Sequence, residues 1–287
     1  MKSSTICELN GTTRARLEML EKTLDASNLT ASAVQGNDDK FQMLTGITWE
    51  IFEKVFGLLS PFLCSEPKNK SSLPLVDQLF ITLVMLRHNM SFELLAQLKD
   101  IPTTTAIDYF WKWVDLIYSK LGFMIKWQDR DTIFQTIPPV FKAEFPHLTS
   151  IIDCIEIFID APKDPKARAQ TWSNHKKHCT VKVFVSCSPV GSINFLSCLW
   201  GGGATDVHVV RESGFISSSL HMPDDQILAD RRFLFHEDLA VQCGAELLTP
   251  ASTKGKKQLS ARELETSRKI SSVRVHIERV IGLLKNR

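Results

Sequence analysis

Three carboxylates occur in sequence settings that suit metal-dependent chemistry on a phosphodiester. Asp153 lies inside the apolar run "SIIDCIEIF", Asp230 ends the apolar run "ILAD", and Glu278 belongs to a long helical segment. Phosphodiester cleavage by two divalent ions requires carboxylates that converge on metals roughly 4 Å apart, and hard ions prefer oxygen ligands. Each of the first two acids also has an ordinary explanation. Asp153 would be a satisfied core carboxylate, and Asp230 would pair at the surface with Arg231 or Arg232.

The elements expected over residues 146–287 would bring these acids together. Alternating, β-branched runs predict strands, and longer segments with caps predict helices. The expected strands are 147–160, 180–191, 192–200, 225–231 and 245–250, and the expected helices are 206–220, 233–244 and 261–286. This order matches the ribonuclease H-like fold, a mixed sheet flanked by helices. In such a sheet the first strand, the end of the fourth strand and the last helix meet.

The final helix carries two neighbouring stripes. The apolar stripe, expected to face the sheet, consists of Ile270, Val273, Ile277, Ile281 and Leu284. The other consists of Arg274, Glu278, Gly282 and Lys285. Arg274 and Glu278 are one turn apart, so an i,i+4 ion pair on a solvated face is the alternative to a catalytic role. Gly282 costs a helix about 1 kcal/mol relative to alanine, which the close approach of a strand or of a phosphate backbone would explain.

The preceding sequence predicts a flexible segment at 1–40, followed by a small all-α domain at 41–145. Thr48 and Ser91 are expected to cap helices, and Ser260 to cap the final one. A short helix, a tight break and a longer helix within about 75–121 predict a helix-turn-helix.

The aromatic residues of that longer helix have two interpretations. Trp111, Trp113 and Tyr118 would form either a core or a platform for stacking bases. The burial habits of aromatic side chains favour the core.

The composition restricts the cellular compartment but does not identify a binding partner. The 287 residues are 44% hydrophobic and 23% charged with a net charge of +2, too mild a balance to indicate nucleic acid by itself. The seven cysteines are scattered without a CxxC pair, which favours a reducing compartment. "NHKKHC" supplies too few ligands for structural zinc. Because no signal peptide or membrane-spanning run is found, the nucleus or the cytoplasm is expected.

Several motifs in fixed order resemble one family. "IIDCIEIFID", "KARAQTWSNHKKHCTVK", "WGGGATD", "ILADRRF", "TKGKKQLS" and "RVHIERVIGLLKNR" resemble the DDE endonuclease domain of PIF/Harbinger-like transposases. The resemblance covers about 146–287, and the segment at 75–121 resembles the helix-turn-helix that precedes this domain in the family. The sequence stops at Arg287, directly after the last motif, as a fragment or a truncated copy would.

The resemblance implies that Asp153, Asp230 and Glu278 form the metal-binding triad for Mg²⁺ or Mn²⁺. It matches Arg274, Glu278 and Lys285 to the Arg-x3-Glu-x6-Lys signature of related insertion-sequence transposases, whose tyrosine position is Ser271 here.

A fourth acid, Asp206 in "GGATD", has two interpretations. It would be either a further metal ligand or, as we expect, the N-cap of the helix that follows. Glu156 and Asp160 lie at odd separations from Asp153 and should face the other side of the first strand.

Basic residues near these motifs suggest a DNA track. The residues expected to bind DNA are Arg274, Lys285, Lys254, Lys256, Lys257, Arg168 and Lys176. For any one lysine, a solvated loop charge is the simpler interpretation.

The expected function is a transposase-derived endonuclease that cleaves duplex DNA, with strand transfer as a further step. The alternative is a domesticated DNA-binding or partner-binding protein that has kept the fold, and an RNA-cleaving hydrolase is a weaker third choice. A homo-oligomer and a separate DNA-binding protein are the further partners that the resemblance suggests. The family usually reads Ala-Asp-Arg-Gly-Phe where this chain has "ADRRF". Glycine there would permit a positive φ that Arg232 resists, which predicts weak cleavage.

Overall fold

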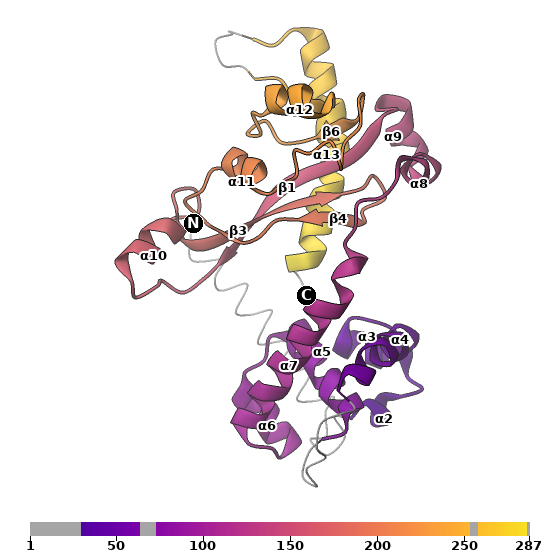
Figure 1. Cartoon of the computed structure of the whole chain (residues 1–287), viewed down its shortest axis with the longest axis vertical. Coiled ribbons are helices and arrows are strands. Elements are labelled where there is room, and N and C mark those ends of the chain that lie inside the picture. The colour runs from indigo at the N-terminus through magenta and orange to yellow at the C-terminus, as the bar shows by residue number, and fades with distance from the viewer. Residues whose placement is uncertain (1–29, 64–72, 253–257, 286–287) are drawn as a thin grey trace. The chain divides into compact units, whose positions relative to one another are not determined.

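The computed structural model describes residues 30–63, 73–252 and 258–285. The chain divides between Phe123 and Met124 into two compact units, which we call the helical unit and the sheet unit (Figure 1). In the described ranges, no helix combines the length and the apolarity needed to cross a membrane.

The helical unit is built around α5 (Leu75–His88), which packs against helices from both sides of it in the sequence. Helices α6 (Phe92–Lys99) and α7 (Thr103–Leu121) follow, and Asp100 between them turns the chain with a φ of 49°. This short helix, tight turn and long helix form the predicted helix-turn-helix. The other elements are α2 (Ala31–Val34), α3 (Asp38–Thr45), α4 (Trp49–Leu59), η2 (Ser60–Phe62) and η3 (Gly122–Met124).

The three predicted helix caps are confirmed. The side chains of Thr48 and Ser91 accept hydrogen bonds from backbone N–H groups in the first turns of α4 and α6. At the start of α13 (Ala261–Lys285), Ser260 and Glu263 bond each other's backbone N–H groups in a capping box.

The prediction of a flexible segment at 1–40 is wrong for its last part. Residues 31–34 and 38–45 are helical, and Ala31 and Val34 are buried. The Ala31 N–H donates to the buried carboxylate of Asp77 at 2.8 Å, which ties this segment to α5. Residues 1–29, with the helix expected at 12–23, lie outside the described ranges.

The aromatic residues of α7 do not all belong to the core. Trp113 is fully buried, and its Nε1 donates to the side chain of Gln78 at 3.3 Å. Trp111 is 54% exposed and Tyr118 is 84% exposed, so the expected burial of these two is wrong. They are seven residues apart, which places them on one face of the helix, different from the face of Trp113.

The sheet unit contains one mixed sheet in the order β2-β3-β1-β6-β7, with β4 and β5 also paired to β3. Strand β3 is antiparallel to β1, whereas β6 is parallel to β1 and β7 is parallel to β6. This is the ribonuclease H-like arrangement that the order of elements predicted. The strands are β1 (Leu148–Phe158), β2 (Trp172–Ser173), β3 (His178–Cys187), β4 (Ile193–Leu196), β5 (Trp200–Gly201), β6 (Gln226–Leu228) and β7 (Glu246–Leu248).

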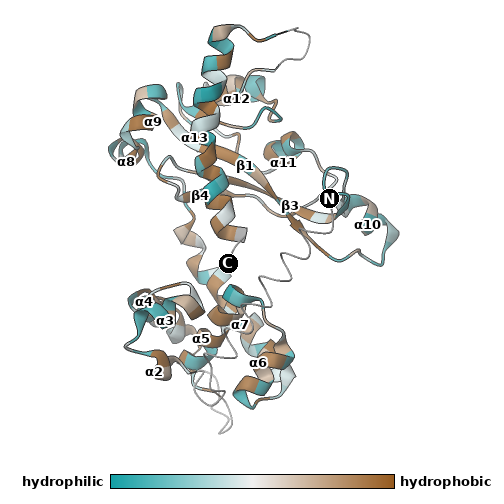
Figure 2. Ribbon diagram, turned by 180° about the vertical axis from the view of Figure 1, so that it is seen from behind, coloured by the Kyte–Doolittle hydropathy of each residue, from teal (hydrophilic) through white to brown (hydrophobic). Residues whose placement is uncertain are grey.

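Helices cover both faces of this sheet. Helix α13 packs on one face, and α11 (Asp206–Glu212) and α12 (His236–Cys243) pack on the other. Figure 1 shows α11 and α12 in front of the sheet, while Figure 2, from behind, shows α13 in front of it. Alternate residues of β1 serve the two faces, since Ile151 and Ile155 contact the α13 core and Ile152 contacts the other.

Residues 124–145, which the sequence grouped with the helical domain, pack with the sheet unit. They form α8 (Arg130–Thr136) and α9 (Pro139–Glu144). Ile137 and Phe145 join the core beneath α13, and Trp127 packs against Phe215 in the core on the opposite face. The boundary between the two units therefore depends on which core these apolar side chains enter. No change in secondary-structure pattern marks it in the sequence.

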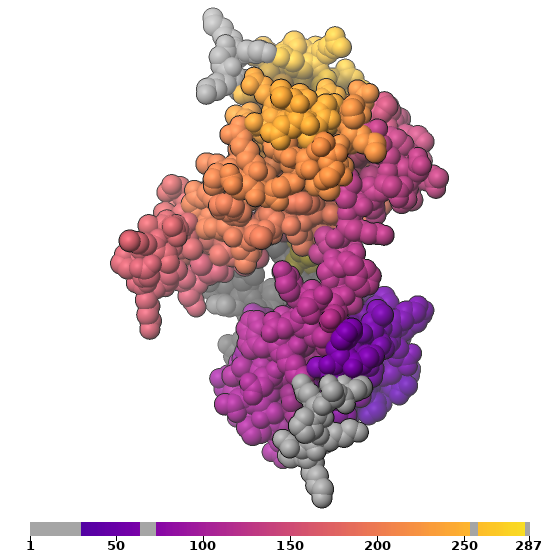
Figure 3. Space-filling view, in the orientation of Figure 1, coloured from indigo at the N-terminus to yellow at the C-terminus, as the bar shows by residue number. Residues whose placement is uncertain are grey.

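Several elements differ in extent from their predicted ranges. The helix expected at 206–220 ends at Glu212, because Gly214 turns the chain with a φ of 78° and Phe215 enters the core. The short helix α10 (Pro165–Thr171) and strand β2 were not predicted. Figure 3 shows the α10 segment as a projection from one end of the sheet unit.

The glycine run before α11 has a packing explanation. A Cβ at Gly201 would lie 2.3 Å from the carbonyl oxygen of Gln170, and one at Gly202 would lie 1.9 Å from Oγ1 of Thr180. The run therefore lets this loop pass directly over α10 and β3.

The predicted apolar stripe of α13 is confirmed except at its end. Ile270, Val273, Ile277 and Ile281 are buried, whereas Leu284 is 41% exposed. Among the described residues, a Cβ at Gly282 would meet nothing within 4 Å, so the close approach of a strand does not explain this glycine.

Candidate active site

Asp153 is held near the middle of β1 on the face covered by α13. It shares that face with Ile151 and Ile155, and only 15% of its side chain is exposed. The N–H of Cys154 donates to its Oδ1 at 2.8 Å. Burial raises the pKa of the Asp153 carboxyl, although this N–H and the charge of Arg274 partly oppose the rise. The ionised form of the Asp153 carboxyl therefore lowers the stability of the folded protein.

Asp230 lies two residues beyond β6, at the carboxyl end of that strand. The backbone N–H of Arg231 donates to Oδ1 at 2.7 Å, and Nε of Arg232 donates to Oδ2 at 3.0 Å. Burial raises the pKa of Asp230, but these hydrogen bonds and the charges of Arg232 and Arg274 outweigh it, so the pKa is lowered. The ion pair with Arg232 that a surface acid would make is therefore present.

The three predicted acids are brought together around one guanidinium, that of Arg274 on α13. Its terminal nitrogens lie 3.8 Å from Asp153 Oδ2, 3.7 Å from Asp230 Oδ1 and 3.8 Å from Glu278 Oε1. The Arg274 side chain is 12% exposed, and its Nε is buried without a hydrogen-bond partner. The i,i+4 pair with Glu278 is thus one of three long ion pairs made by the same side chain. We call Asp153, Asp230, Glu278 and Arg274 the acid cluster.

The donors of the acid cluster suit a hard divalent cation, but their spacing does not form a metal site. All three acids offer carboxylate oxygens, the ligands that Mg²⁺ prefers. In the part of the chain that the structure describes, no three Asp, Glu, His or Cys side chains are close enough to hold an ion. The Arg274 guanidinium lies among the carboxylates, so the donor set would fit a cation once that group moves aside.

Asp206 belongs to a different cluster on the opposite face of the sheet. Nζ of Lys182 lies 2.7 Å from Asp206 Oδ1, 3.8 Å from Glu156 Oε1 and 2.8 Å from the carbonyl oxygen of Ala204. The side chains of Lys182, Asp206 and Glu156 are each at most 11% exposed. We call these three residues the lysine cluster. Glu156 faces away from Asp153, as predicted.

The expectation that Asp206 caps α11 is wrong. The cap is Thr205, whose side chain accepts from the N–H of His208 at 3.2 Å. Asp206 is instead the first residue of the helix, and its carboxylate is used by Lys182. Sequence reasoning missed Lys182, although a lysine inside the strand pattern "TVKVFV" was a signal for a buried partner.

Arg232 connects the two clusters. It donates to Asp230, and its Nη1 lies 3.8 Å from Asp206 Oδ2. Among the described residues other than glycine, φ is positive only at Asn89, Asp100, Lys177 and Asp224. The proposed reason for glycine at this position, a positive φ, is therefore wrong here. Arg232 differs from glycine through its charged side chain, not through backbone strain.

The basic residues expected to bind DNA lie in several places. Arg168 is exposed on α10, where it donates to the carbonyl oxygen of Pro162, and Lys176 is exposed in the turn between β2 and β3. Arg274 is occupied by the acids. Lys254, Lys256, Lys257 and the side chain of Lys285 lie outside the described part of the chain.

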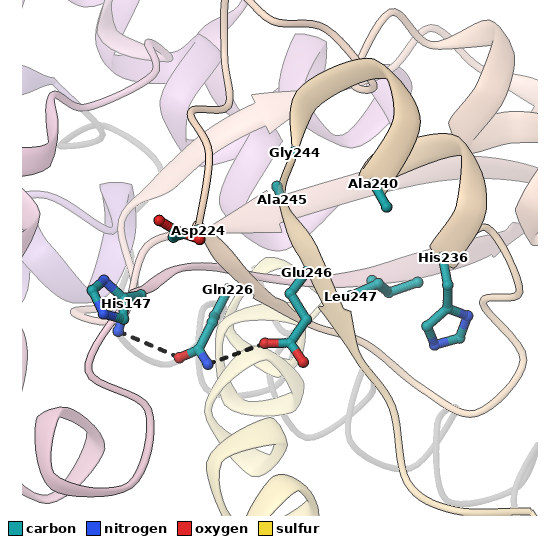
Figure 4. A pocket seen from close by; sticks show the side chains of 9 residues that line it. All are labelled: His147, Asp224, Gln226, His236, Ala240, Gly244, Ala245, Glu246 and Leu247. Carbon is teal, nitrogen blue, oxygen red and sulfur yellow. Dashed lines mark hydrogen bonds between the residues drawn. The ribbon is translucent and has the colours of Figure 1, made fainter.

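A pocket of about 520 Å³ lies at the opposite end of β6 from Asp230 (Figure 4). Its walls include residues at the starts of β6 and β7, namely Gln226 and Glu246, which are joined by a 3.3 Å hydrogen bond. His147, just before β1, bonds Gln226 from the other side. None of the predicted site residues lines this pocket.

Comparison with known families agrees with this geometry. Residues 152–287 match the family described as the DDE superfamily endonuclease. Residues 71–123 match the helix-turn-helix of that superfamily. The chain thus has a DDE superfamily endonuclease domain preceded by the helix-turn-helix of that superfamily, the Harbinger-type architecture. No curated protein and no solved structure gives a significant match.

The two family matches account for the main parts of the fold. The DDE match begins inside β1, one residue before Asp153, and extends past α13, so it includes the whole acid cluster. The helix-turn-helix match includes α5, α6 and α7. The exposed side chains of Trp111 and Tyr118 thus lie on the second helix of a family helix-turn-helix.

Proposed function

We propose that this endonuclease domain hydrolyses phosphodiester bonds of duplex DNA at Asp153, Asp230 and Glu278. The observation that carries the proposal is the convergence of these carboxylates, from β1, the loop after β6 and α13, around one guanidinium. Three acids drawn from such distant parts of a chain would repel one another unless a cation lay among them. The fold therefore places three carboxylates where a bound cation would offset their mutual repulsion.

The three carboxylates would hold two Mg²⁺ or Mn²⁺ ions, which, when bound, activate the attacking water and stabilise the leaving oxygen. A water oxygen forms a new bond to phosphorus, the bond to the 3′ oxygen breaks, and the products are a 3′-hydroxyl and a 5′-phosphate. The burial of Asp153 and the backbone N–H bonds to Asp153 and Asp230 fix these carboxylates in orientation. Strand transfer, in which the 3′-hydroxyl attacks a second DNA duplex, is a further step of this proposal.

DNA would be held by basic residues of the sheet unit and by the helix-turn-helix. Arg168 and Lys176 are exposed and able to contact phosphates. Arg274 would contact phosphate or orient Glu278 after a cation replaces it among the acids. Asp206 is further from this role, because Lys182 occupies one of its oxygens. A nuclear location belongs to the proposal, because the substrate is duplex DNA.

A nicking assay tests the proposal. Supercoiled plasmid is incubated with the full chain and Mg²⁺ or Mn²⁺, and nicked circles are assayed for extendable 3′-hydroxyl ends. The wild type should nick, and Asp153→Asn should not. Asp160→Asn is the matched control, since Asp160 is an exposed acid just beyond β1 and outside the cluster. A wild type that nicks no faster than Asp153→Asn under either ion would refute endonuclease activity.

A second candidate function is a DNA-binding protein that has kept the fold and lost most of its cleavage activity. The observation in its favour is Arg232, a second guanidinium bound to Asp230. Under this alternative the wild type binds duplex DNA but fails to nick it.

A further inference from the structure

We propose that Arg232 is a built-in counter-ion that competes with divalent cations for Asp230 and Asp206. This chain would therefore bind such cations more weakly than it would with glycine at that position. The inference rests on the proposed function, because Asp230 is one of the proposed metal ligands.

The contacts of Asp230 leave neither carboxylate oxygen free. Oδ1 accepts from the Arg231 backbone and faces Arg274, whereas Oδ2 accepts from Nε of Arg232 at 3.0 Å. A cation that binds through Oδ2 must displace the Arg232 hydrogen bond. One guanidinium thus blocks the oxygen of Asp230 that Arg274 does not face.

The same guanidinium also reaches Asp206. Oδ1 of Asp206 is bound by Lys182, and Oδ2 lies 3.8 Å from Nη1 of Arg232. Arg232 therefore bridges two carboxylates, as a bound cation would. Its planar fork of donors suits this bridge, and it keeps its charge at all ordinary pH values. Burial lowers the pKa of Arg232, but the hydrogen bond to Asp230 and the charge of Asp206 outweigh it and raise the pKa.

The exposure of Arg232 makes it a competitor and not a permanent part of the core. Its side chain is 57% exposed, against 12% for Arg274. It also lines a pocket of about 340 Å³ with Asp206 and Lys182, into which it could turn when displaced. Arg232 is therefore the cation that an incoming divalent ion would displace first.

The size of the effect follows from Coulomb's law. The Arg232 side chain is 57% exposed, so a dielectric close to that of water applies, and a unit charge about 5 Å from a divalent ion then changes the affinity of that ion roughly tenfold. Because φ at Arg232 is not positive, substitution removes the charge without relieving backbone strain.

Calorimetric titration of the metal-free full chain with Mn²⁺ tests the inference. The variants are Arg232→Gly, Arg232→Met, which keeps the length without the charge, and Arg232→Lys, which keeps the charge. Arg231→Gly is the matched control, because Arg231 contacts Asp230 through a backbone N–H that glycine retains. The Gly and Met variants should bind Mn²⁺ about tenfold more tightly than the wild type, while the Lys variant and the control stay within about threefold of it.

Several outcomes overturn the inference. Equal Mn²⁺ affinity in the wild type and both uncharged variants does so, as does the absence of Mn²⁺ binding in all forms. Weaker binding to plasmid DNA with unchanged Mn²⁺ affinity would make Arg232 a phosphate ligand instead. Circular dichroism of the metal-free variants establishes folding, and loss of the fold in both uncharged variants would show that Arg232 is structural.

This test can fail independently of the proposed function. Nicking by a wild type whose uncharged variants bind Mn²⁺ no more tightly refutes only the inference. Tighter Mn²⁺ binding by the variants with no nicking in any form refutes only the endonuclease activity.

Discussion

The two charged clusters of the sheet unit lie on opposite faces of the same strands and differ in how closely their partners approach. In the lysine cluster, Lys182 is 2.7 Å from Asp206 and also donates to a carbonyl oxygen at 2.8 Å. In the acid cluster, Arg274 lies 3.7–3.8 Å from each of its three acids, beyond hydrogen-bonding distance. The first is a closed ion pair, and the second is a loose arrangement of like charges around one cation.

This difference separates charges that support the fold from charges that are available for chemistry. A buried pair repays its desolvation only with good geometry and additional hydrogen bonds, which the lysine cluster has. In the acid cluster Arg274 makes no hydrogen bond to any of the three acids, so these acids can exchange this cation for another at small cost. Stability should therefore depend most on the lysine cluster and respond more strongly to added cations at the acid cluster.

The largest expected effect is on stability, from Lys182→Met. The substitution leaves Glu156 buried without its cation and Asp206 with only the longer 3.8 Å contact to Arg232, so the free energy of unfolding should fall by about 3–5 kcal/mol. Urea denaturation measures it, with Lys176→Met, at an exposed position on the preceding turn, as the control expected within about 0.5 kcal/mol of wild type. A loss below about 1 kcal/mol would mean that the lysine cluster is no more structural than the acid cluster.

His221 is buried on the sheet face that α11 and α12 cover, so the cost of charging its ring should make the stability of the protein depend on pH. Its ring packs against Trp127 and Phe215, its Nε2 bonds the Phe215 carbonyl oxygen, and burial lowers its pKa to about 4. Between pH 6.5 and 4 the unfolded chain takes up a proton that the native protein does not, so stability falls as the pH falls. The loss from this residue should approach roughly 3 kcal/mol by pH 4.

The measurement for His221 is urea denaturation at several pH values from 7 to 4, comparing wild type with His221→Phe. The difference between the two removes the contributions of the acids, which both proteins share. The variant should lose less stability than the wild type across this interval. Parallel curves for the two proteins would show that the ring titrates normally.

Sequence patterns were sufficient for the parts of the sheet unit that depend on periodicity. The alternation in β1, the Ser260–Glu263 cap and the apolar stripe of α13 each follow from local spacing, and their order along the chain predicted the sheet. The approach of Asp153, Asp230 and Glu278 followed from that order. What periodicity could not supply was how the charges pair: neither the role of Lys182 nor the bridging position of Arg232 is encoded by neighbours in the sequence.

Two further predictions were wrong because tertiary contacts overrode the preference of the residue type. Asp206 is a good cap by residue type, but Thr205 precedes it and takes that role, which frees Asp206 to pair with Lys182. Trp111 and Tyr118 are aromatic and were expected in the core, yet the phase of α7 turns them outward. Residue type alone does not determine which face of a helix is buried.

Replacement of Arg274 tests whether the acid cluster accepts another cation. Without the guanidinium, the three acids of Arg274→Met repel one another, and the metal-free protein should lose about 1–2 kcal/mol. Millimolar Mn²⁺ should restore most of this loss, because the ion then lies among the same carboxylates. In Lys182→Met, the same Mn²⁺ should restore a much smaller share, because Asp206 and Glu156 are each at most 11% exposed and less open to a hydrated ion. Equal restoration in both variants, or in neither, would remove the distinction between the clusters.

The smallest expected effects are two stability changes of opposite sign, from replacing Asp153 and Asp230 of the acid cluster. Burial raises the pKa of Asp153, so its ionised form costs stability at neutral pH, and Asp153→Asn should stabilise the metal-free protein by about 1 kcal/mol while abolishing nicking. The pKa of Asp230 is lowered, so its ionised form contributes stability above its unfolded pKa that is lost as the pH falls through the folded value. Asp230→Asn should therefore destabilise the protein at pH 7, by less than about 1 kcal/mol because the group is partly exposed. Urea denaturation in EDTA measures both, and shifts of the same sign would mean that the acids share one environment.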